Sequence, residues 1–261
     1  LELGGKSPVI VSDSSNIDIT ARRVMFNKTL NAGQICLAPD YVYVHETQKD
    51  NFVEACKDQV NNFYSDLKYN PDYTSVINQK HYDRLNGLLS DAKDHGAELV
   101  EINPANEDFS QQESHKIPPT LVLNPTDEMQ IMKEEIFGPL LPIKTYKDIN
   151  EPINYINKND KPLGLYYFGN NKNEEAKVVN STTSGGVTVN DIMGHIQQNE
   201  LGFGGVGPSG MGKYDGFDGF MNFSNNKPIY KQIGFGLDKL LDAIRPPYKG
   251  NIEDVLKKLL K

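Results

Sequence analysis

Two cysteines stand in contrasting surroundings, and one of them is a candidate nucleophile. Cys36 lies in segment 33–39 (GQICLAP), between a helical pattern and a strand pattern, whereas Cys56 falls on an apolar helical stripe. A thiol in a loop held by regular elements is well placed to attack a substrate, but it can equally be a small core residue. No histidine lies near Cys36 in the sequence to serve as its base. Both interpretations therefore stay open for Cys36, and Cys56 is predicted to be buried.

Glu2 is an acid among apolar and glycine neighbours in the first six residues, LELGGK. The pair Gly4-Gly5 favours a backbone bend that delivers Glu2 to one side of the following strand. There the carboxylate could act as a general base, through a water molecule, toward a covalent intermediate on Cys36. The alternative is an exposed acid in a plain loop.

A second acidic stretch, Glu134–Pro139 (EEIFGP), joins two acids to an aromatic ring and a Gly-Pro turn just before a strand pattern. One interpretation is an exposed acidic turn with a core Phe. The other is a ligand site, in which an acid accepts hydrogen bonds from a sugar diol while the ring packs on a flat group. Spacing alone does not choose between them.

Two glycine patterns imitate phosphate-binding motifs without the context that such motifs need. Gly5-Lys6-Ser7 ends like a P-loop, but a strand pattern over Pro8–Val11 follows it instead of a helix. The run Gly202–Gly207 fits G-x-G-x-x-G, yet polar residues precede it and Pro208-Ser209-Gly210 follows, so the strand and helix of a dinucleotide fold are not present there. We expect this run to be a loop that packs against another segment.

Seven short apolar runs are typical of strands, and helical spacing lies between most of them. The strand runs are Val9–Val11, Tyr41–Val44, Leu99–Ile102, Thr120–Leu123, Leu140–Tyr146, Leu165–Phe168 and Val187–Val189. The helical stretches begin near Ile17 and end at Gly33, span Phe52–Phe63, and span Tyr82–Ala92. The alternation predicts an α/β fold, a mainly parallel sheet covered by helices. The polar segment Asn103–Lys116 is predicted to be a surface insertion, and Ile252, Val255, Leu256, Leu259 and Leu260 predict an amphipathic C-terminal helix.

Composition excludes several classes of partner. The 261 residues carry a formal charge of −8 without a Lys/Arg cluster, which argues against nucleic acid and against an anionic membrane surface. No apolar run approaches the ~18 residues of a membrane span. Two cysteines cannot build a disulfide framework, so we expect an intracellular, cytoplasmic protein. The five histidines have no metal-ligand spacing, so no metal site is predicted.

In their order along the chain, these motifs resemble those of the aldehyde dehydrogenase superfamily. Leu1–Lys6 is similar to its glutamate motif, Gly33–Cys36 to its cysteine motif and Glu134–Pro139 to its E-E-I-F-G-P motif, while Phe203–Gly212 resembles a fourth motif and explains the false dinucleotide pattern. Two further stretches, Ala38-Pro39-Asp40-Tyr41 and Arg245-Pro246-Pro247-Tyr248, resemble the class 3 or fatty aldehyde dehydrogenase branch. The resemblance covers nearly the whole chain.

The resemblance implies roles for four residues. Cys36 would attack the aldehyde carbonyl as a thiolate, and Glu2, a base placed in an apolar tunnel, would activate the water that hydrolyses the thioester. Glu135 would bind the hydroxyls of the nicotinamide ribose, and Phe137 would pack near the nicotinamide. The implied reaction is NAD- or NADP-dependent oxidation of a medium-chain, long-chain or aromatic aldehyde to its acid.

The resemblance also implies that this chain is the catalytic half of such an enzyme, without the N-terminal nucleotide-binding half. The expected organisation is a catalytic domain with a C-terminal strand or arm region over residues 1–236, followed by an amphipathic helical tail over 237–261. A homodimer is the expected assembly. The rival hypothesis is a truncated, non-enzymatic fragment that serves as a folding or oligomerisation module.

Overall fold

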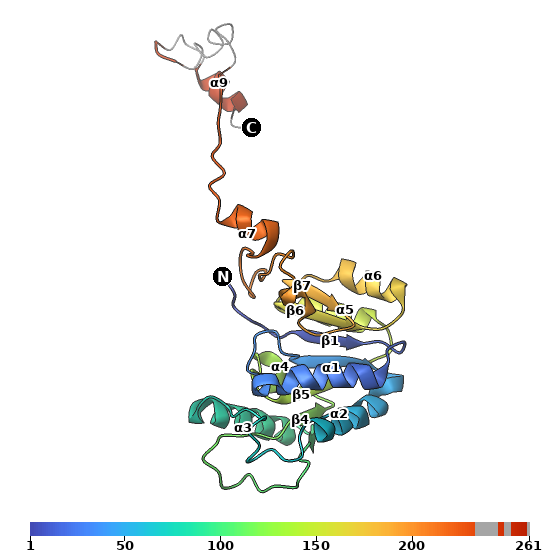
Figure 1. The fold of residues 1–261 in the computed structure, drawn as a ribbon. Helices are drawn as coiled ribbons and strands as arrows, with labels where there is room; N and C mark the ends of the chain where they lie inside the picture. The colour runs from blue at the N-terminus through green and yellow to red at the C-terminus, as the bar shows by residue number, and fades with distance from the viewer. Residues whose placement is uncertain (233–244, 248–251, 260–261) are drawn as a thin grey trace. The chain divides into compact units, whose positions relative to one another are not determined.

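Residues 8–189 form a seven-stranded sheet and its helices (Figure 1) in a computed structural model that describes residues 1–232, 245–247 and 252–259. The strands are β1 (Pro8–Val11), β2 (Tyr41–His45), β3 (Glu98–Glu101), β4 (Thr120–Leu123), β5 (Leu140–Tyr146), β6 (Gly164–Phe168) and β7 (Gly186–Val189). The helices are α1 (Ile17–Thr29), α2 (Lys49–Phe63), α3 (Gln79–Asp94), α4 (Gln130–Lys133), α5 (Asn150–Lys158), α6 (Lys172–Ser181), α7 (Gly216–Asn222) and α9 (Ile252–Leu259). Each of the seven predicted strands is present, and the α/β fold is confirmed.

The sheet has the strand order β3-β4-β5-β2-β1-β6-β7, and only the pair β3 and β4 is antiparallel. A parallel pair needs a crossover, usually a helix, whereas the chain between β3 and β4 is the polar insertion and contains no helix or strand. The strand after the insertion therefore returns alongside β3 in the opposite direction. The mainly parallel sheet and the surface insertion are both as predicted.

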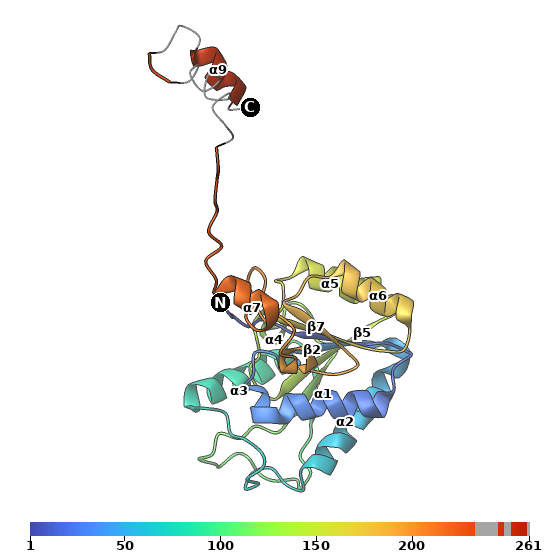
Figure 2. The same ribbon diagram turned by 45° about the horizontal axis from the view of Figure 1, so that its top comes forward.

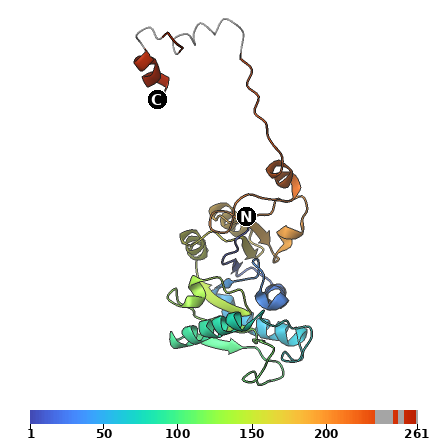
Figure 3. The same ribbon diagram turned by 90° about the vertical axis from the view of Figure 1, so that its left-hand side faces the viewer.

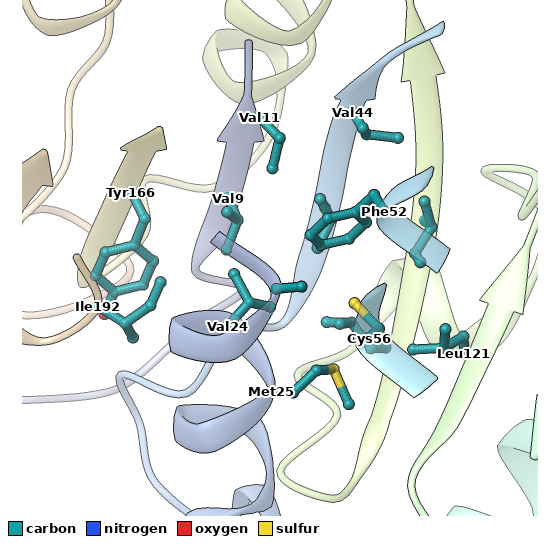
Figure 4. Packing of buried hydrophobic residues seen from close by; sticks show 14 of the residues in the cluster. Val9, Val11, Val24, Met25, Val44, Phe52, Cys56, Leu121, Tyr166 and Ile192 are labelled. Atoms are coloured by element: carbon teal, nitrogen blue, oxygen red, sulfur yellow. The ribbon is translucent and has the colours of Figure 1, made fainter. Parts of the chain in front are cut away.

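Helices cover both faces of the sheet, because side chains of successive strand residues point to opposite faces (Figure 2). On one face, Val9 and Val11 of β1 pack with Val24 of α1 and Phe52 of α2 in one buried cluster (Figure 4). On the other face, Ile10 belongs to a second cluster with residues of α3, α5 and α6. All four β1 residues are buried, as expected for a central strand covered on both sides.

The end of α1 sets the path of the loop that carries Cys36. This helix begins at Ile17, where Asn16 caps it by accepting a hydrogen bond from the N–H of Ile19, and ends at Thr29. Shortly after its end, three consecutive residues have positive φ: Asn31 (50°), Ala32 (53°) and Gly33 (72°). Left-handed backbone is tolerated by Asn31 but unfavourable for Ala32, so the surroundings must hold this turn in place.

Contacts divide the chain into two compact units, Leu1–Phe223 and Ser224–Lys261. The boundary expected at residues 236 and 237 lies outside the described residues, as does Leu260 of the predicted tail helix. Within the second unit, α9 is a helix over Ile252–Leu259. Among the described residues, no helix is long and apolar enough to cross a bilayer.

Candidate active site

Three loops that carry the predicted site residues meet at one edge of the sheet. The Glu2 segment leads into β1, the Cys36 loop leads into β2, and Glu134–Pro139 leads into β5. These three strands are neighbours and run parallel, so their amino ends lie together. Open parallel sheets more often bind ligands at the opposite, carboxyl edge.

Cys36 is half-buried at this edge, and the N–H groups of Cys36 itself and of Leu37 lie near its sulfur. Burial raises the pKa of the thiol, and the carboxylates of Glu2 and Glu135 raise it further, although the two N–H groups act in the opposite direction. The same N–H groups could receive a negative oxygen formed next to the sulfur. Cys56 is fully buried in the core, as predicted, and burial alone raises its pKa.

The segment Leu1–Leu3 is held by the glycine-rich loop Phe203–Gly212, which lies beside the N-terminus in Figures 1 and 3. Leu1 N donates to Met211 O (2.8 Å), Met211 N donates to Leu1 O (3.0 Å), and Leu3 N donates to Ser209 O (2.9 Å). A Cβ at Gly210 would lie 2.3 Å from Leu1 O, so only glycine permits this approach. The residues that follow the false dinucleotide motif therefore pack against the segment that contains Glu2.

The side chain of Glu2 is exposed, so the described residues do not form the apolar enclosure expected around it. Its carboxylate lies close enough to Cys36 to raise the thiol pKa. A hydrogen bond with Glu2 raises the pKa of Tyr214 to about 12. Backbone hydrogen bonds with Phe203 hold Tyr214 in place (2.6 and 2.9 Å). Tyr214 was missed at the sequence level, because it lies far from Glu2 along the chain and has no motif context of its own.

Glu135 is half-buried and lies against the glycine bend of the first motif. A Cβ at Gly4 would stand 2.8 Å from Glu135 Oε2, and the N–H of Gly5 donates to the same carboxylate. Burial raises the pKa of Glu135 to about 7 in spite of this hydrogen bond and the nearby Lys6 and Arg84. Phe137, two residues later, is 39% exposed with a φ of 48°.

Lys6 and Asp40 tie the three loops together. The Nζ of Lys6 donates to the Asp40 carboxylate and to the carbonyls of Ile131 (2.8 Å) and Glu134 (2.8 Å). Asp40, only 3% exposed, also accepts the N–H of Ile136 (2.8 Å). The pair therefore has a structural role at the site, whereas the sequence placed Lys6 in a false P-loop and in the glutamate motif without predicting that role.

A second lysine, Lys28 of α1, holds the Cys36 loop through a backbone carbonyl. It is fully buried, its Nζ donates to Pro39 O (2.8 Å), and burial lowers its pKa to about 8. On the same loop, a Cβ at Gly33 would lie 2.3 Å from Gly138 O. The Cys36 loop thus packs tightly on the chain that carries Glu135 and Phe137.

The residues at this edge fit one end of a nicotinamide dinucleotide. A half-buried carboxylate suits a ribose diol, and the exposed ring of Phe137 suits a flat heterocycle. The run Gly202–Gly207 does not fit the pyrophosphate, because it continues into a turn, with a bridge between Gly207 and Gly210, and not into a helix. No group of three or more potential metal ligands occurs in the part of the chain that the structure describes.

The sequence matches known proteins over almost its entire length. A "Probable coniferyl aldehyde dehydrogenase" of Caulobacter vibrioides is 52% identical over 98% of this chain and 53% of its own length. "Aldehyde dehydrogenase family 3 member A2" of Rattus norvegicus is 41% identical over 87% of this chain and 45% of its own length. A solved structure described as the substrate bound state of Staphylococcus aureus AldH has a TM-score of 0.79 at 38% identity, covering 100% of this chain and 55% of that one.

The chain therefore spans about half the length of the relatives that it matches. The model of the aldehyde dehydrogenase family matches residues 1–229. This match includes the loops of Glu2, Cys36 and Glu135 that meet at the amino edge of the sheet. Its sequence, its fold and the order of its motifs place this chain in the aldehyde dehydrogenase family.

Proposed function

We propose that this chain is the catalytic part of an enzyme that oxidises an aldehyde to its carboxylic acid with NAD or NADP. The observation that carries the proposal is the meeting of Cys36, Glu2 and Glu135 at one edge of the sheet, where both carboxylates influence the thiol. The aldehyde is medium-chain, long-chain or aromatic, and the name of the coniferyl aldehyde relatives supports the aromatic class.

Cys36 is the nucleophile in this proposal. Its thiolate attacks the carbonyl carbon, a C–S bond forms, and the carbonyl oxygen becomes an oxyanion that the N–H groups of Cys36 and Leu37 are placed to receive. Glu135 would accept hydrogen bonds from the hydroxyls of the nicotinamide ribose, and Phe137 would pack beside the nicotinamide. A bound dinucleotide would supply the hydride acceptor, so that loss of hydride from the substrate carbon leaves a thioester on Cys36.

Glu2 completes the reaction as a general base. Its carboxylate takes a proton from a water molecule, the hydroxyl oxygen bonds to the thioester carbon, and the C–S bond breaks to release the acid and the thiolate. Tyr214, whose hydroxyl interacts with Glu2, orients the carboxylate toward this water. The exposure of Glu2 gives water access to the carboxylate.

The experiment that tests this function is an assay of aldehyde-dependent NADH or NADPH formation in the natural protein that contains this sequence. Cys36→Ala should abolish product formation, while Cys56→Ala should retain most of it because Cys56 lies in the core. The reverse pattern would contradict the assignment. No turnover in the unmodified protein, with either dinucleotide and with both aliphatic and aromatic aldehydes, would favour the non-enzymatic module instead.

A further inference from the structure

Arg84 of α3 holds the backbone of Glu134–Phe137, which we term the Glu135 turn. Its NH1 group lies 3.3 Å from Glu134 Oε1 and 3.4 Å from the carbonyl oxygen of Glu135. Its NH2 group donates to the carbonyl of Ile136. One side chain therefore contacts three successive residues that immediately precede Phe137.

The same region of the chain also holds the loop of Cys36. Just before α3, Ile77 N donates to Gln34 Oε1 (2.9 Å), and Gln34 Nε2 donates to Ser75 O (3.0 Å). Residues 75–84 thus contact both functional loops, although they belong to neither motif. A displacement of α3 would move the Glu135 turn and the Cys36 loop together.

The Glu135 turn needs external support. Phe137 has a φ of 48°, a conformation that a bulky side chain rarely adopts unless its surroundings impose it. Lys6 binds the carbonyls of Ile131 and Glu134 from one side, and Arg84 binds those of Glu135 and Ile136. A guanidinium suits this task because its rigid fork serves several acceptors in one plane, which a lysine ammonium cannot do.

We propose that Arg84 is a positioning residue that keeps the Glu135 carboxylate against Gly4 and Gly5 and keeps the ring of Phe137 presented to the cofactor. The second half of this statement rests on the proposed function. The first half concerns only the geometry of the Glu135 turn. Arg84 acts through the turn and is not assigned any contact with substrate or cofactor.

The protonation of Glu135 reports on Arg84, because the charged groups that face Glu135 are Asp40, Lys6 and Arg84. Ionised Glu135 raises the pKa of Cys36, and Arg84 favours the ionised form of Glu135. The rate of alkylation of Cys36 by neutral iodoacetamide should rise with pH, because the fraction of thiolate rises. Near pH 7, where Glu135 loses its proton, the thiol becomes harder to deprotonate, so the rise should flatten into a shallow step. Neither an aldehyde nor a dinucleotide is needed, so failure here is distinct from failure of the proposed function.

The experiment uses the 261-residue chain carrying Cys56→Ala, so that a single thiol reacts. Arg84→Met should move the step upward by ~0.2 to 0.7 pH unit, the size expected for a partly exposed charge interaction. Arg84→Lys should keep the step near its original pH. Hydrogen exchange of residues 134–138 should become roughly five- to tenfold faster in both variants, since the fork to the carbonyls is lost.

Arg22→Met on α1 is the matched control, because Arg22 is an exposed arginine on the opposite face of the sheet. It should change neither the step nor the exchange. A purely structural role for Arg84 would lower the folded fraction without moving the step. The proposal is overturned if the exchange of residues 134–138 in Arg84→Met matches that of the control, whether or not the step moves. If Arg84→Met does not fold, unchanged exchange in Arg84→Lys overturns it equally.

Discussion

The backbone of Gly4 lies directly against the carboxylate of Glu135, so that a methyl group on Gly4 would stand 2.8 Å from Oε2 and 2.9 Å from Oε1. The next residue, Gly5, donates its N–H to the same carboxylate. The glycine pair therefore bends the chain after Glu2 and also makes room for an acid from a distant loop. Two site motifs are joined by this contact.

Gly4→Ala should destabilise the chain by about 1 to 2 kcal/mol, because its φ of 84° disfavours any side chain and the new methyl would displace Glu135. Gly87→Ala is the control. Gly87 lies in the exposed part of α3 with nothing within 4 Å of its Cβ position, so alanine should stabilise by ~0.5 to 1 kcal/mol. Urea unfolding measures both, and equal stability of Gly4→Ala and the unmodified chain would contradict the packing described.

The raised pKa of Glu135 predicts how stability depends on pH. In the unfolded chain the carboxyl loses its proton near its ordinary value of 4.5, and in the folded chain near 7. Between these values the folded state binds more protons, so the free energy of unfolding falls as pH rises from 4.5 to 7. After allowance for partial exposure, the loss attributable to this group is about 1 to 2 kcal/mol.

Glu135→Gln should remove this contribution to the pH dependence. We expect the difference in free energy of unfolding between the variant and the unmodified chain to shift in favour of the variant as the pH rises from 5 to 8. Urea unfolding at both pH values measures this shift. Glu113→Gln, at an exposed acid of the insertion, should show no such gain. A stability difference between Glu135→Gln and the unmodified chain that stays constant with pH would refute the raised pKa.

The two thiols should differ in reactivity in the folded chain. Iodoacetamide should modify half-buried Cys36 directly, whereas fully buried Cys56 should react only through local unfolding. Peptide mapping after timed labelling gives both rates, and in urea the two rates should converge. Faster labelling of Cys56 than of Cys36 under native conditions would show that the core around α2 is open.

Glu2→Gln should slow steady turnover of the natural protein by about 10² to 10⁴, the usual effect of losing a general base. An acyl group should then accumulate on Cys36 and be visible by mass spectrometry. Glu46→Gln, at an acid beyond the far end of β2, should leave turnover unchanged. Normal turnover of Glu2→Gln without any acyl adduct would transfer the role to another residue.

The 261-residue chain should bind NAD more weakly than micromolar. Glu135 and Phe137 are the only candidate cofactor ligands assigned among the residues the structure describes. Two or three hydrogen bonds to a ribose contribute roughly 0.5 to 1.5 kcal/mol each, well short of the ~8 kcal/mol of micromolar affinity. Calorimetric titration with NAD and NADP tests this, and micromolar binding would reveal a further cofactor site in this chain.

The sequence by itself determined the strands, three of the helices that cover them, and the glycines at a bend and at a helix end. The seven strands and the helices α1, α2 and α3 were predicted because their apolar spacing is a local property, present before any tertiary contact forms. Gly4-Gly5 was likewise predicted as a bend and Gly33 as the end of a helix, and all three have positive φ, a local requirement that glycine meets. The motifs were therefore placed on the correct loops.

The tertiary structure alone decided which loops meet and which residues support them. The order of strands brings the Glu2, Cys36 and Glu135 loops together, and no local periodicity encodes that order. Lys6 and Asp40, Tyr214 beside Glu2, and Arg84 on the Glu135 turn are contacts between residues far apart in the chain. They depend on how the folded elements pack, and for this reason the sequence could propose candidate reactive residues but not the residues that position them.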